Sequence, residues 1–136
     1  MKTILIVQEE PLLIEVFKRT LSNYRLLDAT SAVQAMDVYR RCPKIDLLIT
    51  DMVLPVVSGM ELASLLKAWL PELQVILTAD TPAEYWSTEQ TILFGEISSE
   101  SVAVLEKPFL PAQLREQVAV LIGPPAAVPS IAVPVG

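Results

Sequence analysis

The sequence has 136 residues, a formal net charge of −6, one cysteine and no histidine. A chain of this length suits one compact domain, which buries about two-thirds of the surface exposed by its unfolded chain. The lack of histidine excludes Ser-His-Asp hydrolysis, Cys-His nucleophiles and His-ligated metal sites. The single cysteine, Cys42, allows no intramolecular disulfide and favours a reducing, cytoplasmic compartment. An acidic chain without a run of Lys or Arg is not expected to bind nucleic acid directly.

Neither end of the chain predicts a membrane segment. The apolar run Thr3–Val7 is too short for a signal peptide, and Gln8-Glu9-Glu10 ends it. Residues 118–136 carry no charge, but four prolines interrupt them, at positions 124, 125, 129 and 134. Such a segment cannot satisfy its own backbone groups in a bilayer. We therefore expect a domain over residues 1–122 and a disordered Pro/Ala/Val-rich tail over residues 123–136.

Short apolar runs alternate with longer helical patterns along the chain. Strands are predicted at Thr3–Val7, Arg25–Ala29, Asp46–Thr50, Gln74–Thr78 and Ser101–Glu106. Helices are predicted from Pro11 to about Leu21, after a Ser31 cap to about Arg41, from Ser58 or Gly59 to Trp69, and at Pro111–Ile122. Residues 81–100 show no clear period. The alternation predicts an α/β fold, a flavodoxin-like doubly wound five-stranded parallel sheet with helices on both faces.

Several side chains receive a structural interpretation at this stage. The first helix is expected to bury an apolar stripe of Leu12, Leu13, Val16, Phe17 and Leu21. Asp28 and Asp80 are interpreted as turn or capping residues. Tyr85 and Trp86 are interpreted as core or cover residues rather than as contacts for a partner.

Polar residues stand where the predicted strands end. Gln8-Glu9 follows the first strand, Asp51 the third and Lys107 the fifth, while Thr78 closes the fourth. A parallel sheet brings these carboxyl ends to one edge, where ligands of doubly wound sheets bind. Carboxylates suit Mg²⁺, and lysine and a hydroxyl suit a phosphoryl group. The sequence thus predicts a site for a divalent cation and a phosphoryl group.

From Lys2 to Ile122 the sequence resembles response-regulator receiver domains. The segment from Asp46 to Gly59 is similar to the family's phosphoacceptor strand and loop, with Pro55 four residues after Asp51 and Gly59 eight residues after it. Thr78-Ala79 resembles the family's Thr/Ser-Ala pair, and Lys107-Pro108-Phe109 resembles its Lys-Pro-Phe signature, in which the Lys-Pro bond is usually cis. The resemblance implies a chemotaxis-regulator-like fold, and we predict the strand order 2-1-3-4-5.

The resemblance also implies roles for these residues. Asp51 would accept a phosphoryl group from a phosphohistidine on a sensor histidine kinase or phosphotransfer protein. Thr78 would bond a phosphoryl oxygen and report phosphorylation by moving, and Lys107 would pair first with Asp51 and then with the phosphate. Mg²⁺ would be held by Glu9, Asp51 and the backbone carbonyl of Val53.

A chain with these roles is a single-domain signalling protein of a two-component phosphorelay rather than an enzyme. It would support its own phosphotransfer and dephosphorylation, with the small Ala79 leaving the phosphate open to water. It would act by switching contacts with a downstream protein that the sequence does not identify. The sequence leaves a homodimer open.

The chain departs from the family at two positions. Gln8 stands where the family usually has a first acidic residue, so it could hold Mg²⁺ only weakly or through water, and the affinity for Mg²⁺ is expected to be weakened. Val104 stands where the family usually has an aromatic residue that turns inward on activation. We therefore expect any activation signal to travel through residues 81–100.

Two other functions compete with a phosphorylated receiver. A pseudo-receiver, which is a phosphorylation-independent binding module of the same fold, is favoured by Gln8 and Val104 but opposed by the combination of Asp51, Thr78 and Lys107. A flavodoxin-like cofactor protein ranks last, because no Gly-rich phosphate loop follows the first strand and the chain has only four glycines.

Overall fold

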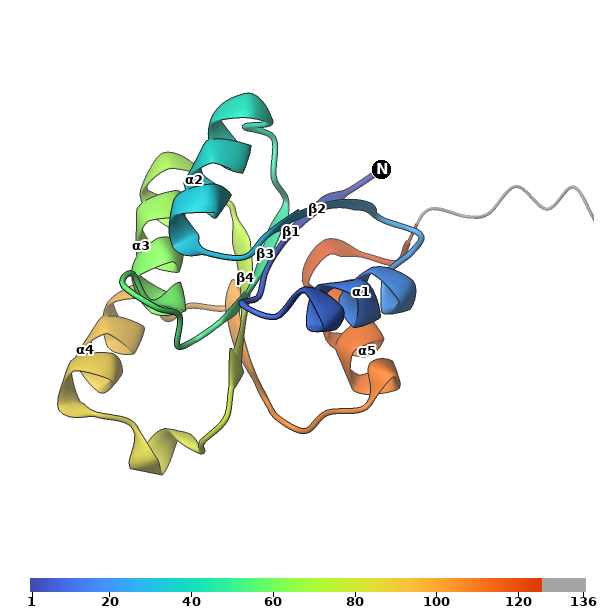
Figure 1. Cartoon of the computed structure of the whole chain (residues 1–136). Coiled ribbons are helices and arrows are strands. Elements are labelled where there is room, and N and C mark those ends of the chain that lie inside the picture. Colours follow the sequence, from blue (N-terminus) through green and yellow to red (C-terminus); the bar gives the residue numbers. More distant parts are fainter. Residues whose placement is uncertain (126–136) are drawn as a thin grey trace, which may run out of the picture.

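The computed structural model describes residues 1–125, which form a parallel five-stranded sheet with helices on both faces (Figure 1). The strand order β2-β1-β3-β4-β5 confirms the predicted topology. The strands are β1 Thr3–Val7, β2 Arg25–Ala29, β3 Leu47–Asp51, β4 Gln74–Ala79 and β5 Val102–Glu106. The helices are α1 Pro11–Thr20, α2 Ala32–Arg41, α3 Gly59–Trp69, the short 3₁₀ turn η1 Ala83–Tyr85, α4 Thr88–Ile97 and α5 Pro111–Ile122.

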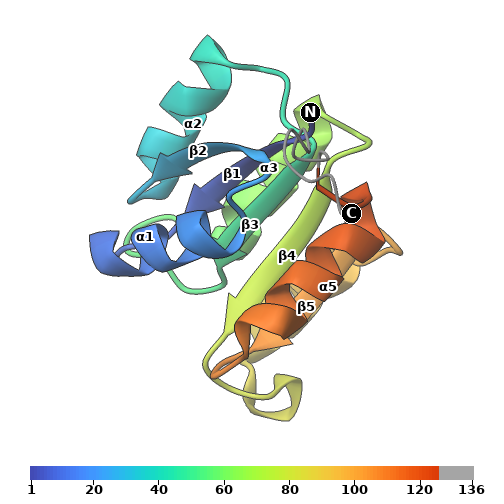
Figure 2. The same ribbon diagram turned by 90° about the vertical axis from the view of Figure 1, so that its right-hand side faces the viewer.

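Successive residues of each inner strand enter opposite halves of the core. Ile4 and Ile6 of β1 pack in one cluster with residues of α1 and α5, and Figure 2 shows these two helices side by side in front of the sheet. Leu5 and Val7 belong to the other cluster, beneath α2, α3 and α4. A strand buried on both faces needs an unbroken apolar run, which is why β1 could be placed from sequence to the residue.

Helix starts follow their capping residues. Ser31, Ser58 and Ser87 each accept a hydrogen bond from the backbone N–H three residues later, at the starts of α2, α3 and α4. In α4 the Gln90 side chain also accepts a hydrogen bond from the Ser87 backbone N–H, which completes a capping box. The sequence pattern does not predict α4, because its residues form no clear apolar stripe.

The segment before α4 corrects one interpretation and agrees with the other. Trp86 covers the core: its Nε1 donates to the Thr81 carbonyl at 3.0 Å, and its ring meets Phe94 edge-on at a centroid distance of 5.3 Å. Tyr85 is 73% exposed, so its interpretation as a core or cover residue is wrong. The η1 turn places adjacent aromatic side chains in different environments, which no helical period predicts.

The buried face of α1 also differs from the expected stripe. Phe17 and the following Leu21 are buried as expected, together with Ile14, whereas Leu12 is 80% and Val16 55% exposed, and Leu13 is 37% exposed. Spacings of three and four residues fit both sets, and contact with the sheet selects the set containing Ile14. The apolar side chains on the other face of α1 remain at the surface.

Strand ends differ from the prediction by about one residue. β3 begins at Leu47 and includes Asp51, and β4 extends to Ala79. Asp46, expected as the first residue of β3, instead accepts the Thr3 backbone N–H on Oδ2 at 2.8 Å. This polar bond ties the start of β3 to the start of β1.

Helix α5 ends at Gly123, where φ is 86°. The carbonyl of Gly123 accepts a hydrogen bond from the Tyr24 hydroxyl at 2.9 Å. The tail predicted over residues 123–136 lies outside the described residues from position 126 onward. Within residues 1–125, no helix has both the length and the apolar character needed to cross a bilayer.

Candidate functional site

Strand register brings Asp51, Thr78 and Lys107 to the same edge of the sheet. Asp51 on β3 lies opposite Thr78 on β4, and Ala79 lies opposite Glu106 on β5. The next residue, Lys107, donates its backbone N–H to the Ala79 carbonyl at 2.8 Å. The Lys107–Pro108 bond is cis, as the resemblance implies. The three predicted site residues, Asp51, Thr78 and Lys107, therefore lie at the carboxyl ends of adjacent strands.

Two donors converge on one oxygen of Asp51. Lys107 Nζ lies 2.9 Å from Asp51 Oδ1, and Thr78 Oγ1 lies 3.2 Å from the same atom. Within residues 1–125, no side-chain or backbone donor contacts Oδ2. The Asp51 side chain is 18% exposed. Among the described residues, Oδ1 is thus held by two donors, and Oδ2 accepts no hydrogen bond.

The lysine is set between two carboxylates. Burial, the largest single influence, lowers the pKa of Lys107, but the hydrogen bond and charge of Asp51, with a smaller share from Asp80, raise this pKa on balance. Asp80 Oδ1 lies 3.5 Å from Lys107 Nζ. The interpretation of Asp80 as a turn or capping residue was thus incomplete, and its position directly after Thr78-Ala79 at a strand end is the signal that could have identified it. Lys107 is cationic at neutral pH.

Gln8 contributes to the same group of side chains. Its side chain is only 1% exposed, and its backbone N–H donates to the Ala29 carbonyl at 3.1 Å. Its Nε2 lies 3.4 Å from Thr78 Oγ1, a long but buried contact. From sequence, Gln8 is expected only to hold Mg²⁺ weakly or through water. In the structure its side chain instead contacts the hydroxyl of Thr78.

The loop after Asp51 is held closely against the strands. The Met52 N–H donates to the Thr78 carbonyl at 2.8 Å, and the Gly59 N–H donates to the Met52 carbonyl at 3.0 Å. The Val57 N–H donates to the Pro55 carbonyl at 2.8 Å across Val56, which has φ 69°. This is the strained, positive-φ form of a γ-turn, and β-branched residues rarely adopt it.

The group around Asp51 is not a cage of carboxylates in the part of the chain that the structure describes. No group of three or more His, Cys, Asp or Glu side chains that could hold a metal occurs within residues 1–125. Glu9 is exposed and forms no ion pair there, and no described donor bonds the carbonyl of Val53. Within residues 1–125, no hydrogen bond joins Glu9 or Val53 to Asp51. Mg²⁺ commonly accepts one or two carboxylates and completes its shell with water.

A pocket of about 300 Å³ lies beside the site, between α1 and the start of α5. Gln8 and Lys107 line it together with the apolar side chains of Leu13, Val16 and Phe109. Leu13 and Val16, two of the residues expected in the core, therefore line this pocket beside the site. This apolar surface therefore lies next to the group of polar side chains around Asp51.

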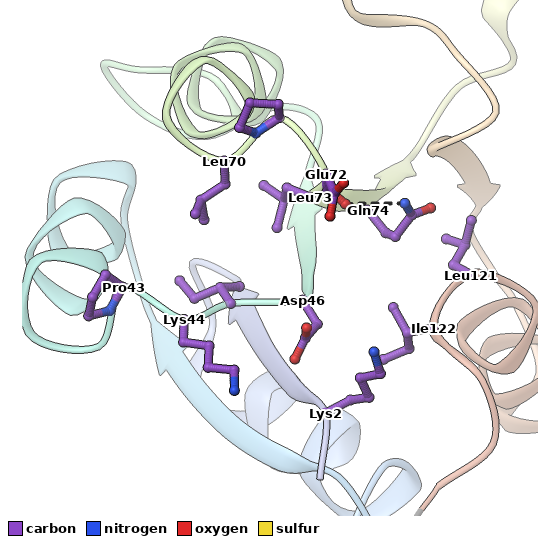
Figure 3. A pocket seen from close by; sticks show the side chains of 12 residues that line it. Lys2, Pro43, Lys44, Asp46, Leu70, Glu72, Leu73, Gln74, Leu121 and Ile122 are labelled. Carbon is purple, nitrogen blue, oxygen red and sulfur yellow. Dashed lines mark hydrogen bonds between the residues drawn. The ribbon is translucent and has the colours of Figure 1, made fainter.

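A wider hollow of about 800 Å³ lies at the opposite end of the sheet, where β1, β3 and β4 begin (Figure 3). Lys2, Lys44 and Asp46 lie near one another on one side of it, and Leu121 and Ile122 of α5 lie on another. The Asp46 carboxylate is already bonded to the Thr3 backbone. The hollow is not lined by Gln8, Asp51, Thr78 or Lys107, so the carboxyl edge of the sheet remains the candidate site.

Comparisons with known proteins agree with this geometry. The sequence model described as the response regulator receiver domain matches residues 4–119. A response regulator receiver domain protein from Clostridium thermocellum is 25% identical, with coverage of 90% of this chain and 94% of that one and a TM-score of 0.74. A CheY-like receiver domain protein from Methanospirillum hungatei is 23% identical (88% and 92% covered, TM-score 0.75), and a chemotaxis protein from Vibrio cholerae is 18% identical (90% and 99% covered, TM-score 0.75).

A search of the curated proteins finds no match. The family match nevertheless spans every strand of the sheet, from within β1 into α5, and includes the residues at its carboxyl edge. This chain therefore belongs to the response regulator receiver domain family.

Proposed function

We propose that this receiver domain accepts a phosphoryl group on Asp51 from a phosphohistidine of a sensor histidine kinase or phosphotransfer protein. Its phosphorylation state then switches its contacts with a downstream protein. The convergence of Lys107 Nζ and Thr78 Oγ1 on a single oxygen of Asp51 carries this proposal. A purely structural aspartate has no need to keep its second oxygen free beside a cationic lysine.

The transfer is a direct displacement at phosphorus. Asp51 Oδ2 forms the new P–O bond while the P–N bond to the donor imidazole breaks, and the imidazole nitrogen keeps the electron pair and takes up a proton. Lys107 and Thr78 lie where they can stabilise negative charge on the phosphoryl oxygens, and such positioned charges supply most of the catalysis in phosphoryl transfer. No proton has to leave Asp51, because the attacking group is a carboxylate.

Mg²⁺ is part of the proposal, with Glu9, Asp51 and the Val53 carbonyl as its protein ligands and Gln8 contributing weakly or through water. When bound, the ion would offset negative charge on the phosphoryl oxygens. The neutral Gln8 leaves two carboxylates for this task, which predicts a weakened affinity for Mg²⁺.

The donor protein is proposed to dock over the exposed face of α1. Leu13 and Val16 border the pocket that reaches Gln8 and Lys107, so a partner seated there would lie next to Asp51. Burial of these side chains in a complex removes apolar surface from water, which favours association. A cytoplasmic location, where such donors act, belongs to the same proposal.

The phosphoryl group is expected to be released by water in the absence of a partner. Ala79 at the end of β4 is small, and we infer from this that water would reach the phosphoryl group, so that the domain would support its own dephosphorylation as well as its own phosphotransfer. The downstream protein and a homodimer stay open, because nothing at the site identifies either.

Intact mass measurement after incubation with acetyl phosphate and Mg²⁺ tests the proposal. Wild type is expected to gain one phosphoryl group and Asp51→Asn none. Asp37→Asn, which changes an exposed aspartate paired only with Arg40 at 2.9 Å, is the matched control and should behave as wild type. Phosphorylation of Asp51→Asn at the wild-type level would refute the assignment of the acceptor.

One observation favours a second function. The buried Gln8 replaces a carboxylate and bonds Thr78, which suits a phosphorylation-independent binding module. The variant Gln8→Asp distinguishes the two: under the first proposal it tightens Mg²⁺ binding in a titration and speeds the phosphorylation that wild type already shows. If only Gln8→Asp gains a phosphoryl mass and wild type never does, the natural protein is a pseudo-receiver.

A further inference from the structure

Three side chains at the carboxyl edge of the sheet form a directional chain of hydrogen bonds. Gln8 Nε2 lies 3.4 Å from Thr78 Oγ1, and Thr78 Oγ1 lies 3.2 Å from Asp51 Oδ1. A threonine hydroxyl has one proton to donate and two lone pairs that accept. If that proton goes to Asp51, Gln8 can only be a donor to Thr78. Both Gln8 and Thr78 are buried, at 1% and 0% exposure, so water does not compete freely for these groups.

The orientation of the Gln8 amide follows from the strength of the acceptors. A carboxylate is a stronger acceptor than an amide oxygen. The Thr78 proton therefore goes to Asp51, and the amide nitrogen of Gln8, rather than its oxygen, faces the hydroxyl. The reverse orientation would leave two oxygens, on Gln8 and Asp51, sharing a single proton.

We propose that Gln8 is a positioning residue that holds the Thr78 hydroxyl on Asp51 before any phosphoryl group arrives. This inference rests on the proposed function and describes how its site is prepared. The resemblance implies that Thr78 moves when the domain is phosphorylated. In this chain Thr78 Oγ1 already lies 3.2 Å from Asp51 Oδ1, so we expect no change of its side-chain rotamer when Asp51 is phosphorylated.

The chemistry of position 8 explains why this applies to the present chain. An ionised aspartate, the residue usual in the family, has no proton to offer Thr78. It would place a second negative charge near Asp51, and the Thr78 hydroxyl could then donate its proton to either carboxylate. A neutral amide at position 8 leaves the Asp51 carboxylate as the acceptor of that proton and adds an N–H that donates to Thr78 Oγ1.

The test measures the χ1 rotamer of Thr78 by methyl NMR in the unphosphorylated protein. Three-bond couplings to the Thr78 methyl carbon report whether one staggered rotamer is populated or several are averaged. Wild type is expected to show one rotamer. Gln8→Met keeps the length of the side chain but has no donor. It should shift the ratio of this rotamer to the others by about two- to fivefold, the lower part of the range for a hydrogen bond, because the contact of 3.4 Å is long.

Gln74→Met is the matched control. Gln74 lies at the opposite end of the same strand as Thr78, and its Nε2 donates only to the Glu72 carbonyl at 3.3 Å. It should leave the Thr78 couplings unchanged. Melting temperatures of both variants separate packing from positioning: a lower melting temperature of Gln8→Met with wild-type Thr78 couplings would overturn the inference.

Beryllofluoride with Mg²⁺, a mimic of the phosphoryl group, completes the experiment. The couplings of wild type should not change when the mimic binds, whereas those of Gln8→Met should return to the wild-type values. Averaged couplings in unliganded wild type that become single only with the mimic would refute the inference. If the mimic and acetyl phosphate both fail to load Asp51, the proposed function fails, but the comparison of unliganded rotamers still decides the role of Gln8.

Discussion

Replacing Gly59 with alanine is predicted to displace the strand that carries Asp51. A Cβ added at Gly59 would overlap the Asp51 carbonyl oxygen and would lie 2.8 Å from the Asp51 carbonyl carbon and 2.9 Å from Thr50 Oγ1. Two of these atoms belong to the backbone of β3 and cannot rotate away as the end of a side chain could. The first turn of α3 and the end of β3 must therefore separate.

The expected loss of stability follows from two opposing effects. Glycine to alanine within a helix normally stabilises it by about 1 kcal/mol. Forcing an extra carbon into a packed region costs about 1–3 kcal/mol, and occasionally more. Because the overlap at Gly59 is with backbone atoms, we expect a cost at the upper end of that range and a net loss of about 2 kcal/mol. Such a loss lowers the melting temperature by roughly 7 °C in a domain of this size.

Gly95 in α4 is the matched control for the same substitution. A Cβ added there meets no atom within 4 Å. Gly95→Ala should stabilise the domain by about 0.5–1 kcal/mol. Urea unfolding of both variants, read as the change in midpoint at constant m-value, measures the difference.

The two alanine variants should change stability in opposite directions. A Gly59→Ala protein whose free energy of unfolding lies within about 0.5 kcal/mol of wild type would refute the close approach of α3 to β3. It would also weaken the placement of Asp51, because the same glycine allows the loop to fold back beneath that residue.

Four further predictions concern other parts of the molecule. Removal of residues 124–136 should leave the melting temperature nearly unchanged, whereas a large fall would show that the tail packs on the domain or on another subunit. Hydrogen exchange within residues 81–100 should change when beryllofluoride binds, because β5 supplies no aromatic ring to carry the signal; no change despite confirmed binding would count against this route. Val56→Asn should raise the midpoint of unfolding slightly, since asparagine tolerates a positive φ better than valine; a lower midpoint would contradict the strained turn. Tyr24→Phe should cost about 1 kcal/mol at neutral pH through the lost bond to Gly123. Burial raises the pKa of Tyr24 above 10.0, so this contribution is complete below pH 10 and is lost as pH rises through the folded pKa. The stability difference between wild type and Tyr24→Phe should therefore narrow in alkaline urea titrations, and a constant difference would show that Tyr24 does not titrate with unfolding.

The order of strands and helices could be predicted because it depends on local patterns. The run Thr3–Val7 is apolar enough to be buried on both faces, and its predicted bounds match β1. Pro11, Ser31, Ser58 and Pro111 mark helix starts whose backbone chemistry acts within one turn. The spacing of Asp51, Pro55 and Gly59 resembles that of the receiver family, and the family match over residues 4–119 includes it.

Contacts between distant segments could not be predicted from those patterns. In α1 two apolar faces have the same spacing, and only packing on the sheet decided that Ile14 is buried while Leu12 and Val16 stay exposed. Helix α4 has little amphipathic signal, and its start became clear from the reciprocal bonds of Ser87 and Gln90.

The residues of the candidate site show the same division. The sequence by itself predicted that Asp51, Thr78 and Lys107 meet at one edge of the sheet, since each directly ends or follows an apolar strand and parallel strands end at one edge. It did not show that Asp80 would lie near Lys107, nor that Gln8 would bond Thr78. The last pair is separated by 70 positions along the chain. The direction of a side chain and the identity of its partner depend on the order and register in which β1, β3 and β4 pair in the sheet. Only the tertiary structure therefore decided that Gln8 donates a hydrogen bond to Thr78.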